Sequence, residues 1–396
     1  MLYLKGASTM PKLWSALFLV LVAGAVFAAE APPEAHVSLQ AWREQKLTDY
    51  PGHTGQILKS RAATLSFGPI EYSLQYNAAT DPAKPDVVFP LEGYVGMPGP
   101  VSTGWYHGGF LFLAINGQDI GSTPLSSMTV VEQGQRGMLD LVWYGAQAAV
   151  RERFVGLGGD DALLVEITLE PKAEVKTLSV RGLCYPSYFT SWNKRKGARR
   201  VKTPSALVEE GKPQTLAPAG NWWLCYYDEV FDVARGEGDG PCAMVVLPEE
   251  TTEIKVDPGD YAVSTNITCR PDVRKIHLAF WKFPNQKNAD VLTAFPQKAQ
   301  KAAAALRTAD FTPTAIKKTD FAAVQKEVSE ALASPQCRAV LGDRAKEIEA
   351  WLKEQAPLLP KAPAQADIAT TEKLLQAVDQ YNQFYWEVKL ARLLEF

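Results

Sequence analysis

Residues 138–169 read MLDLVWYGAQAAVRERFVGLGGDDALLVEITL. The segment contains three runs rich in apolar and β-branched residues, Met138–Tyr144, Ala149–Val155 and Leu163–Leu169. The turn-forming sequence Gly-Gly-Asp-Asp separates the last two runs, because glycine and aspartate readily adopt tight turns. Runs of this length between turn residues predict consecutive antiparallel strands.

The same texture extends on both sides of this segment. Further runs of comparable length are Ile70–Tyr76, Phe110–Ile115, Val175–Leu183, Trp222–Tyr227, Ala243–Leu247, Tyr261–Thr268 and Ile276–Phe283. No helical periodicity of similar length interrupts the series, which argues against alternating strands and helices. The sequence therefore predicts a mainly β fold, with a large antiparallel β-sandwich over residues 62–285.

The pattern changes to helix in residues 286–396, which we predict to form a small α-helical C-terminal region. Four helices are expected, over Ala289–Leu306, over Phe321–Ala333 with Asp320 as cap, from Ser334-Pro335 to Lys353, and over Thr371–Leu394. The last of them has an apolar stripe at helical spacing. This stripe can pack on the sandwich, within the helical region, or against another copy in self-association.

The N-terminal segment has the features of a signal peptide. Lys5 and Lys12 precede an apolar run that ends near Ala28, so we predict cleavage after residue 28 and a periplasmic or extracellular location. The run is shorter than the roughly 20 residues of a spanning helix, so no stable membrane insertion is expected after cleavage. Residues 29–61 are predicted to be a spacer with a short helix between Ser38 and Lys46.

Composition limits the partners and cofactors. The formal net charge is −3, which argues against nucleic acid as the main partner. The five cysteines show no C-x-x-C spacing and are either buried thiols or members of one or two disulfides. They are Cys184, Cys225, Cys242, Cys269 and Cys337. None of the four histidines lies at ligand spacing from a cysteine, so neither a metal site nor a cofactor is predicted.

Residues 221–229 read NWWLCYYDE and hold four aromatic rings and two adjacent carboxylates. On a strand, side chains alternate between two faces. One face would carry Trp222, Leu224, Tyr226 and Asp228, and the other Trp223, Cys225, Tyr227 and Glu229. Such rings beside carboxylates suit a saccharide, whose ring faces present C–H groups and whose edges present hydroxyls. The alternative is a central strand covered by protein on both faces.

A second candidate cluster is Trp105-Tyr106-His107, which precedes the run at Phe110. Trp105 and Tyr106 are candidate ligand-binding residues, and His107 can exchange a proton near neutral pH. Asp228, Glu229 and His107 are therefore the candidate catalytic residues. The two acids point to opposite faces of a strand, so they do not form the carboxylate pair of a glycosidase by themselves.

A basic run over residues 194–202 is the third candidate. It contains Lys194, Arg195, Arg199 and Arg200, and it follows the aromatic residues Tyr185, Tyr188, Phe189 and Trp192. Arginine binds carboxylate and sulfate groups through two parallel hydrogen bonds. An exported protein meets anionic glycans more readily than nucleic acid, so the run predicts an anionic saccharide ligand. The alternative is a solvated hairpin tip.

The hairpins from Leu141 through Val150 and from Leu163 to Leu183, followed by the aromatic stretch, resemble galactose-mutarotase-like domains and the sandwich domains of polysaccharide-active enzymes. The resemblance covers about residues 62–284 and implies a β-supersandwich. Mutarotases use a histidine acid and a glutamate base at the sugar ring. No motif here matches either position, so the resemblance assigns no catalytic residue.

These observations favour an exported, carbohydrate-associated binding or accessory protein for a neutral or anionic saccharide. Two alternatives stay open. The chain is an epimerase, hydrolase or lyase if His107 or a tyrosine lies beside a carboxylate in one cleft. It is a structural or assembly module if the aromatic residues are all core.

Overall fold

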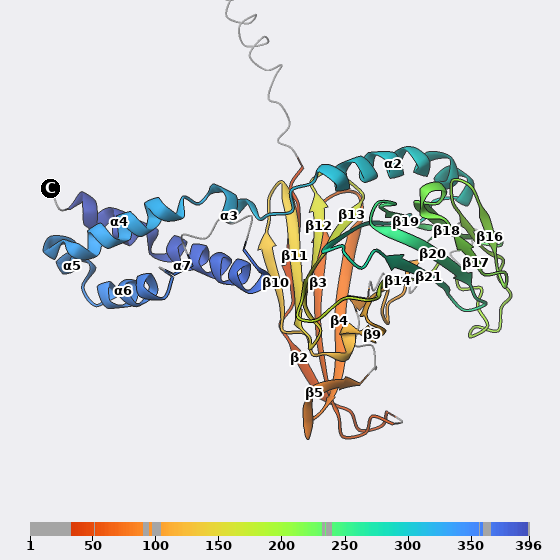
Figure 1. Ribbon diagram of the computed structural model, residues 1–396, viewed down its shortest axis with the longest axis horizontal. Coiled ribbons are helices and arrows are strands. Elements are labelled where there is room, and N and C mark those ends of the chain that lie inside the picture. The colour runs from red at the N-terminus through yellow and green to blue at the C-terminus, as the bar shows by residue number, and fades with distance from the viewer. Residues whose placement is uncertain are drawn as a thin grey trace, which may run out of the picture.

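The structure, a computed structural model, describes residues 33–50, 52–89, 95–96, 104–231, 234, 240–355, 357–358 and 366–394. The predicted signal peptide, residues 1–28, lies outside the described residues. Figure 1 shows a β-sandwich with one long helix across its top and a group of helices that extends away from one side.

One sheet of the sandwich has nine strands among the described residues, all antiparallel to their neighbours. In spatial order they are β10 (Ser127–Glu132), β11 (Arg136–Tyr144), β12 (Ala148–Leu157), β13 (Leu163–Pro171), β22 (Lys275–Lys282), β19 (Cys242–Val246), β18 (Trp223–Asp228), β15 (Arg199–Lys202) and β16 (Leu207–Glu209). The hairpins predicted within residues 138–169 are therefore confirmed as β11, β12 and β13.

The other sheet has thirteen strands among the described residues. Its main path is β1 (His36–Leu39), β3 (Ile57–Ser66), β4 (Glu71–Asp81), β6 (Val95–Gly96), β8 (Leu111–Ile115), β14 (Leu178–Tyr185), β21 (Val263–Cys269), β20 (Thr251–Pro258) and β17 (Gln214–Leu216). Branching from that path are β2 (Arg43–Lys46), β5 (Lys84–Phe89), β7 (Gly104–Trp105) and β9 (Gln118–Asp119). Two short 3₁₀ helices, Ile120–Ser122 and Pro218–Gly220, lie in loops.

The main core lies between the two sheets. Alternate residues of each strand point inward, as in Leu139, Leu141 and Trp143 of β11, which are buried with Leu65 and Leu74 of the facing sheet. Burial of such side chains contributes roughly 1.5–3 kcal/mol each relative to exposure. The predicted antiparallel sandwich is confirmed.

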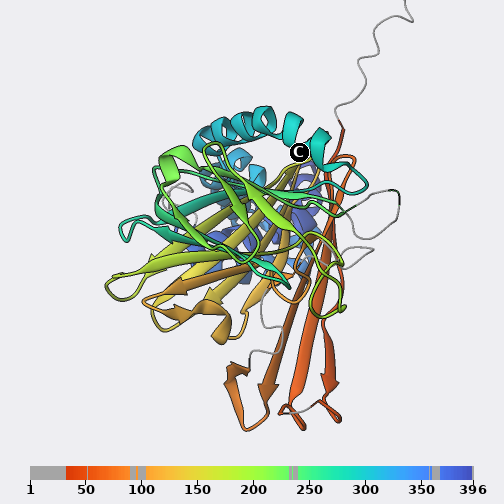
Figure 2. The same ribbon diagram turned by 90° about the vertical axis from the view of Figure 1, so that its right-hand side faces the viewer.

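A second core lies on the outer face of the nine-stranded sheet, under α2 (Asn288–Thr308). Figure 2 shows this helix lying across the top of the sandwich. The ring of Phe295 contacts the rings of Trp223, Trp281 and Phe283 at centroid distances of 5.6, 5.2 and 6.0 Å. Although α2 belongs by sequence to the predicted helical region, it packs on the sandwich.

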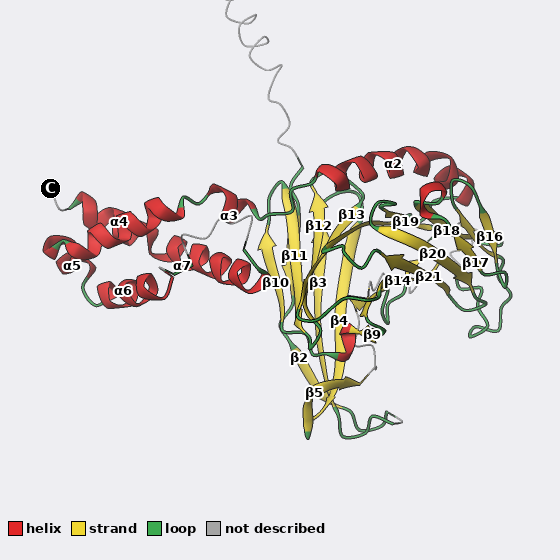
Figure 3. Ribbon diagram, in the orientation of Figure 1, coloured by secondary structure: helices red, strands yellow, loops and turns green. Residues whose placement is uncertain are grey.

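The remaining helices form an arm at the side of the sandwich (Figure 3). They are α3 (Thr314–Lys318), α4 (Phe321–Ala333), α5 (Pro335–Leu341), α6 (Arg344–Gln355) and α7 (Ile368–Leu393). Helix α7 buries Leu374, Phe384 and Val388 inside the arm. Its first turn contacts the sandwich, where Glu372 accepts hydrogen bonds from Ser127 and Tyr144, both at 2.6 Å. The apolar stripe thus packs within the arm, whereas the N-terminal end of α7 contacts the sandwich through Ile368 and Glu372. Self-association through α7 stays a prediction.

Two expectations are wrong. The helix predicted between Ser38 and Lys46 is absent, and β1 and β2 there pair with β3, so the described part of the predicted spacer, residues 33–50 and 52–61, belongs to the sandwich. Pairing with a neighbouring strand outweighs the local helix preference of this stretch. The helix predicted from Ser334 to Lys353 is broken at Gly342, whose φ of +56° ends α5.

All five cysteines are buried, and none of them is joined in a disulfide. This agrees with the alternative in which they behave as small hydrophobic residues. Within the described part of the chain, no helix is both long and apolar enough to cross a membrane.

Candidate functional site

The aromatic strand β18 is covered by protein on both faces. Leu224 and Tyr226 point into the core between the sheets, whereas Trp223 and Cys225 face α2. Tyr226 is 1% exposed and its hydroxyl lies 2.9 Å from that of Thr265. The alternation predicted for this strand is confirmed, but its rings do not form a saccharide platform.

The other aromatic candidates of this region are also enclosed or displaced. Trp223 and Tyr227 are buried, and Trp222 is half-buried beside a separate hollow of about 290 Å³ next to α2. Trp105 is 2% exposed and donates its indole N–H to the Trp281 carbonyl at 2.9 Å. The prediction of one surface site is wrong for Trp105, Trp223 and Tyr227, because packing in the core uses their apolar area. For Trp222, ligand binding stays a prediction.

The two adjacent acids have different surroundings. Asp228 is fully buried and accepts hydrogen bonds from the Ser187 hydroxyl at 2.6 Å and from the backbone N–H groups of Ala198 and Val230 at 2.9 and 3.1 Å. Glu229 is exposed and pairs with Arg200 at 2.9 Å. The acids are not a catalytic pair. Asp228 instead fixes the loop between β14 and β15.

The basic run divides in the same way. Arg199 is fully buried, pairs with Glu210 at 3.2 Å, and donates to the backbone carbonyls of Phe189 and Asp260. Lys194 and Arg195, by contrast, are exposed. Arg199 is therefore a structural residue, and the exposed part of the run is the candidate for ligand contact.

An open pocket of about 640 Å³ brings several predicted and unpredicted residues together. Its walls are aromatic, with Tyr185 at the end of β14, Tyr188 and Trp192 in the following loop, and Tyr261 between β20 and β21. Its polar lining residues are His107, which follows β7, together with Asn193 and Arg195. We call this site the aromatic pocket.

The tyrosine wall is held by mutual contacts. The hydroxyls of Tyr106 and Tyr261 lie 3.0 Å apart, and the rings of Tyr185 and Tyr261 have centroids 5.5 Å apart. Partial burial, followed by the hydrogen bond with Tyr106, raises the pKa of Tyr261 above its ordinary value. Tyr261 is therefore a neutral phenol at physiological pH. It can donate or accept a hydrogen bond, but it is not a phenolate that could act as a general base.

The loop over residues 186–198 has a defined backbone. The N–H of Lys194 donates to the Ser191 carbonyl and that of Arg195 to the Thr190 carbonyl, both at 3.0 Å, and Lys194 adopts a φ of +54°. Gly197 passes so close to Asp228 that an added Cβ would lie 2.6 Å from its Oδ2. Asp228 and Arg199 therefore lie under this loop and fix its backbone, and the loop carries Tyr188, Trp192 and Arg195.

We expect Asp228→Asn to loosen this loop. Asparagine has an NH₂ group in place of one of the two carboxylate oxygens, so that position can no longer accept a hydrogen bond from the loop. Loss of a hydrogen bond to this buried side chain should cost about 1–2 kcal/mol. Hydrogen exchange measured by mass spectrometry should show amides of residues 186–198 exchanging roughly tenfold faster, with β12 and β13 unchanged. Glu229→Gln is the matched control, because Glu229 is exposed. Equal exchange in both variants would contradict the role given to Asp228.

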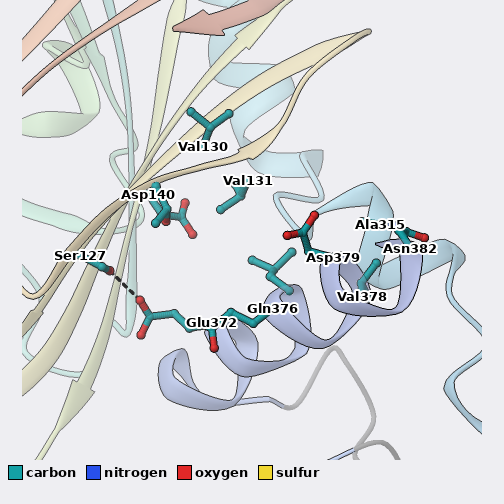
Figure 4. A pocket seen from close by; sticks show the side chains of 12 residues that line it. Ser127, Val130, Val131, Asp140, Ala315, Glu372, Gln376, Val378, Asp379 and Asn382 are labelled. Atoms are coloured by element: carbon teal, nitrogen blue, oxygen red, sulfur yellow. Dashed lines mark hydrogen bonds between the residues drawn. The ribbon is translucent and has the colours of Figure 1, made fainter. Parts of the chain in front are cut away.

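A second cavity, of about 390 Å³, lies between β10, β11 and α7 (Figure 4). Its polar groups include Asp140 and Glu372. Asp140 forms an ion pair with Arg153, and Glu372 accepts the hydrogen bonds that attach α7 to the sheet. Because these carboxylates already hold the arm and the sheet together, we do not place the ligand site here.

Part of the aromatic pocket was predictable from the sequence. His107 and Arg195 are predicted site residues, and Tyr185, Tyr188 and Trp192 precede the basic run. Asn193 and Tyr261 were not predicted, because only the fold brings them into the pocket. Within the described residues, no group of three or more histidine, cysteine or acidic side chains is arranged to hold a metal ion.

No protein-family model and no curated protein sequence matches the chain. Similar solved structures include a "putative aldose 1-epimerase" from Klebsiella pneumoniae, at 9% identity over 68% of this chain and 96% of that one, with a TM-score of 0.36. Another of the same description, from Escherichia coli K12, has 7% identity over 56% of this chain and 99% of that one, with a TM-score of 0.32.

A third similar structure is a protein in glycosyl hydrolase family 38 from Enterococcus faecalis. It has 8% identity over 73% of this chain and a TM-score of 0.36, and the present chain covers 42% of its length. These similarities concern backbone arrangement alone.

Proposed function

We propose that the chain is an exported saccharide-binding protein whose ligand occupies the aromatic pocket. The observation that carries the proposal is the Trp192 side chain, which is 80% exposed at the edge of a pocket walled by tyrosines. A large aromatic side chain kept in water beside a concave site favours a ligand that covers it.

The chemistry of the pocket suits a sugar ring. Flat aromatic faces complement the C–H groups of a pyranose, while hydroxyl, amide and imidazole groups complement its hydroxyls. Tyr261 stays neutral and Asn193 is oriented by donating to the Tyr188 carbonyl at 3.1 Å. These groups provide both donors and acceptors at the pocket edge.

Binding is favoured over hydrolysis of the ligand. Glycosidases act through two carboxylates on either side of the scissile bond. Among the described residues that line the aromatic pocket there is no carboxylate. The two acids predicted as candidates lie elsewhere, because Asp228 is buried beneath the loop and Glu229 pairs with Arg200. His107 has no acidic neighbour in this lining with which to share an acid–base role.

Export is the second part of the proposal. The basic and apolar pattern of residues 1–28 supports it, and the negative formal charge of the whole chain fits a saccharide better than a nucleic acid. N-terminal sequencing of the protein recovered from a secreting host should give Ala29 as the first residue. A protein that retains Met1 would contradict this part.

We expect Trp192→Ala to weaken saccharide binding by about tenfold or more, because it removes the exposed stacking surface. Glycan-array screening of the wild type should identify ligands, and calorimetric titration should then compare the variants. Trp386→Ala is the matched control, because Trp386 is 75% exposed on α7, outside the pocket. The proposal is wrong if the wild type binds no glycan or if both variants lose affinity equally.

A further inference from the structure

We infer that the hollow next to α2 is a second binding site, which takes a single neutral sugar unit. It lies between α2 and the segments that precede β18 and follow β19, and we call it the α2 hollow. Its lining residues are Ala219, Trp222, Pro248, Gln300, Ala303 and Arg307. Among the described residues, none lines both this hollow and the aromatic pocket, so the inference goes beyond the proposed function and does not depend on it.

Trp222 forms a fixed aromatic surface at this hollow. Its side chain is half-buried and packs against both the core between the sheets and the core under α2. Its backbone carbonyl accepts a hydrogen bond from the Val246 N–H at 2.9 Å. A ring held in this way needs no further ordering when a ligand covers its open part, so little conformational entropy is lost on binding.

Helix α2 supplies the polar groups of the hollow. Gln300, Ala303 and Arg307 lie three and four residues apart, so they share one side of the helix. The small side chain of Ala303 leaves a depression between the two long polar ones. The Gln300 amide is both a donor and an acceptor, and the Arg307 guanidinium is a donor. The α2 hollow therefore combines an apolar surface with a few polar groups, as small-molecule sites do.

The charges at the hollow favour a neutral ligand. Arg307 donates from Nε and Nη2 to the two carboxylate oxygens of Glu249, at 2.7 and 3.3 Å. The carboxylate balances the charge of the guanidinium, and this pairing does not involve Nη1, which can donate to a hydroxyl group. An anion would have to compete with Glu249 for the guanidinium, whereas a sugar hydroxyl needs only one donor.

A sugar ring suits this surface better than a wholly apolar ligand of the same size. Its C–H face can cover the indole of Trp222 while hydroxyls at its edge reach Gln300 and Arg307. An apolar ligand would cover these polar groups without bonding to them, which costs free energy. The volume, about 290 Å³ against about 640 Å³ for the aromatic pocket, suits one ring rather than a chain.

Fluorine NMR of the protein labelled with 5-fluorotryptophan tests this inference, because it reports on the two sites separately. Trp222→Phe and Trp192→Phe assign the two resonances. The probes are methyl β-glucopyranoside, methyl β-galactopyranoside and methyl α-mannopyranoside. At least one probe should shift the Trp222 resonance in a saturable way, with a dissociation constant in roughly the millimolar range. The uronic acid analogue of that probe should bind at most about twofold more tightly.

Gln300→Ala should weaken this binding about fivefold, because it removes one hydrogen bond to the ligand. Gln297→Ala is the matched control, since Gln297 is exposed on the same helix and lies outside the lining of the hollow. This second variant should bind like the wild type.

Three results would overturn the inference: no probe shifts the Trp222 resonance, the two glutamine variants bind equally, or the uronic acid binds more than about twofold more tightly than its neutral counterpart. A response confined to the Trp192 resonance would also overturn it, and would leave the proposed function standing. A Trp222 response in a protein whose aromatic pocket binds no glycan would support this inference and overturn the proposed function instead.

Discussion

Glutamine in place of Glu152 is expected to raise the free energy of unfolding at pH 8 by on the order of 3–5 kcal/mol and to change it little at pH 5. Glu152 lies on β12, between Leu141 of β11 and Ile167 of β13. It is 2% exposed, and its Oε2 is buried without a hydrogen-bond partner. Burial, with a smaller contribution from the charge of Asp119, raises its pKa to about 8.

The sign follows from the direction of this shift. A carboxyl whose pKa is higher in the folded state than in the unfolded state holds its proton more tightly when folded. Below about pH 4.5 the carboxyl is protonated in both states and does not lower the free energy of unfolding. As the pH rises from there to about 8, the unfolded state loses the proton first, so the free energy of unfolding falls. Glutamine has the same shape and cannot ionise, so the variant escapes this loss.

Urea unfolding of the wild type and Glu152→Gln from pH 5 to pH 9 measures the effect as a difference between two curves. His277 also titrates: burial alone would lower its pKa, but Glu166 and Glu250 outweigh burial and raise it to about 9. Its contribution is present below about pH 6.5 and is lost as the pH rises through 9. This loss occurs in both proteins and cancels in the difference.

Glu253→Gln is the control, because Glu253 is exposed on β20 and its substitution should leave the pH profile unchanged. A difference between the wild type and Glu152→Gln that does not grow with pH would show that Glu152 is not held neutral in the core.

The strands and helices were largely predictable, because the spacing of apolar residues and the turn or cap residues that bound each element lie within the element's own stretch of sequence. The runs of β11, β12 and β13 lie between turn residues, and Asp320 caps α4 at the predicted residue by accepting a hydrogen bond from the Ala323 N–H. The segment from Ser38 to Lys46 shows the limit. Its residues favour a helix locally, yet pairing of β1 and β2 with β3 decides its conformation.

The site was less predictable, because residue type does not reveal what covers a side chain. The rings of β18 are as aromatic as those of the pocket, but α2 and the facing sheet cover them. Arg195 and Arg199 stand four residues apart in one basic run, and only the fold exposes the first and buries the second. Tyr261 reaches the pocket from a distant hairpin, and no local pattern indicates this.

A row of charged side chains across the outer face of the nine-stranded sheet was also not predictable from the sequence. In register across β11, β12, β13 and β22 lie Asp140, Arg153, Glu166 and His277. Each of the four lies at an outward position of its strand, where a polar side chain in the sequence alone indicates contact with solvent. The segment between α2 and α3 covers the row instead, and its Phe311 ring stacks on His277 with centroids 5.7 Å apart.

Substitution of Arg153 by methionine should destabilise the protein by about 3–5 kcal/mol, because the variant leaves the Asp140 carboxylate buried without its cation. Arg153 is 1% exposed and donates to both oxygens of Asp140, at 2.7 and 2.6 Å. It also donates to the Phe311 carbonyl at 2.5 Å, so it connects the sheet to the segment that leads into the arm.

The double variant Arg153→Met with Asp140→Leu should recover much of this loss, since two apolar side chains of similar volume replace the buried pair. Urea unfolding of the wild type, both single variants and the double variant gives the coupling energy of the pair. If the loss of unfolding free energy in the double variant equals the sum of the losses in the two single variants, Arg153 and Asp140 do not stabilise each other. Limited proteolysis separates the second role of Arg153: cleavage near residues 309–313 should stay faster in the double variant, because methionine cannot hold the Phe311 carbonyl. The ion pair would then account for the stability of the sheet, and the third hydrogen bond for the attachment of the arm.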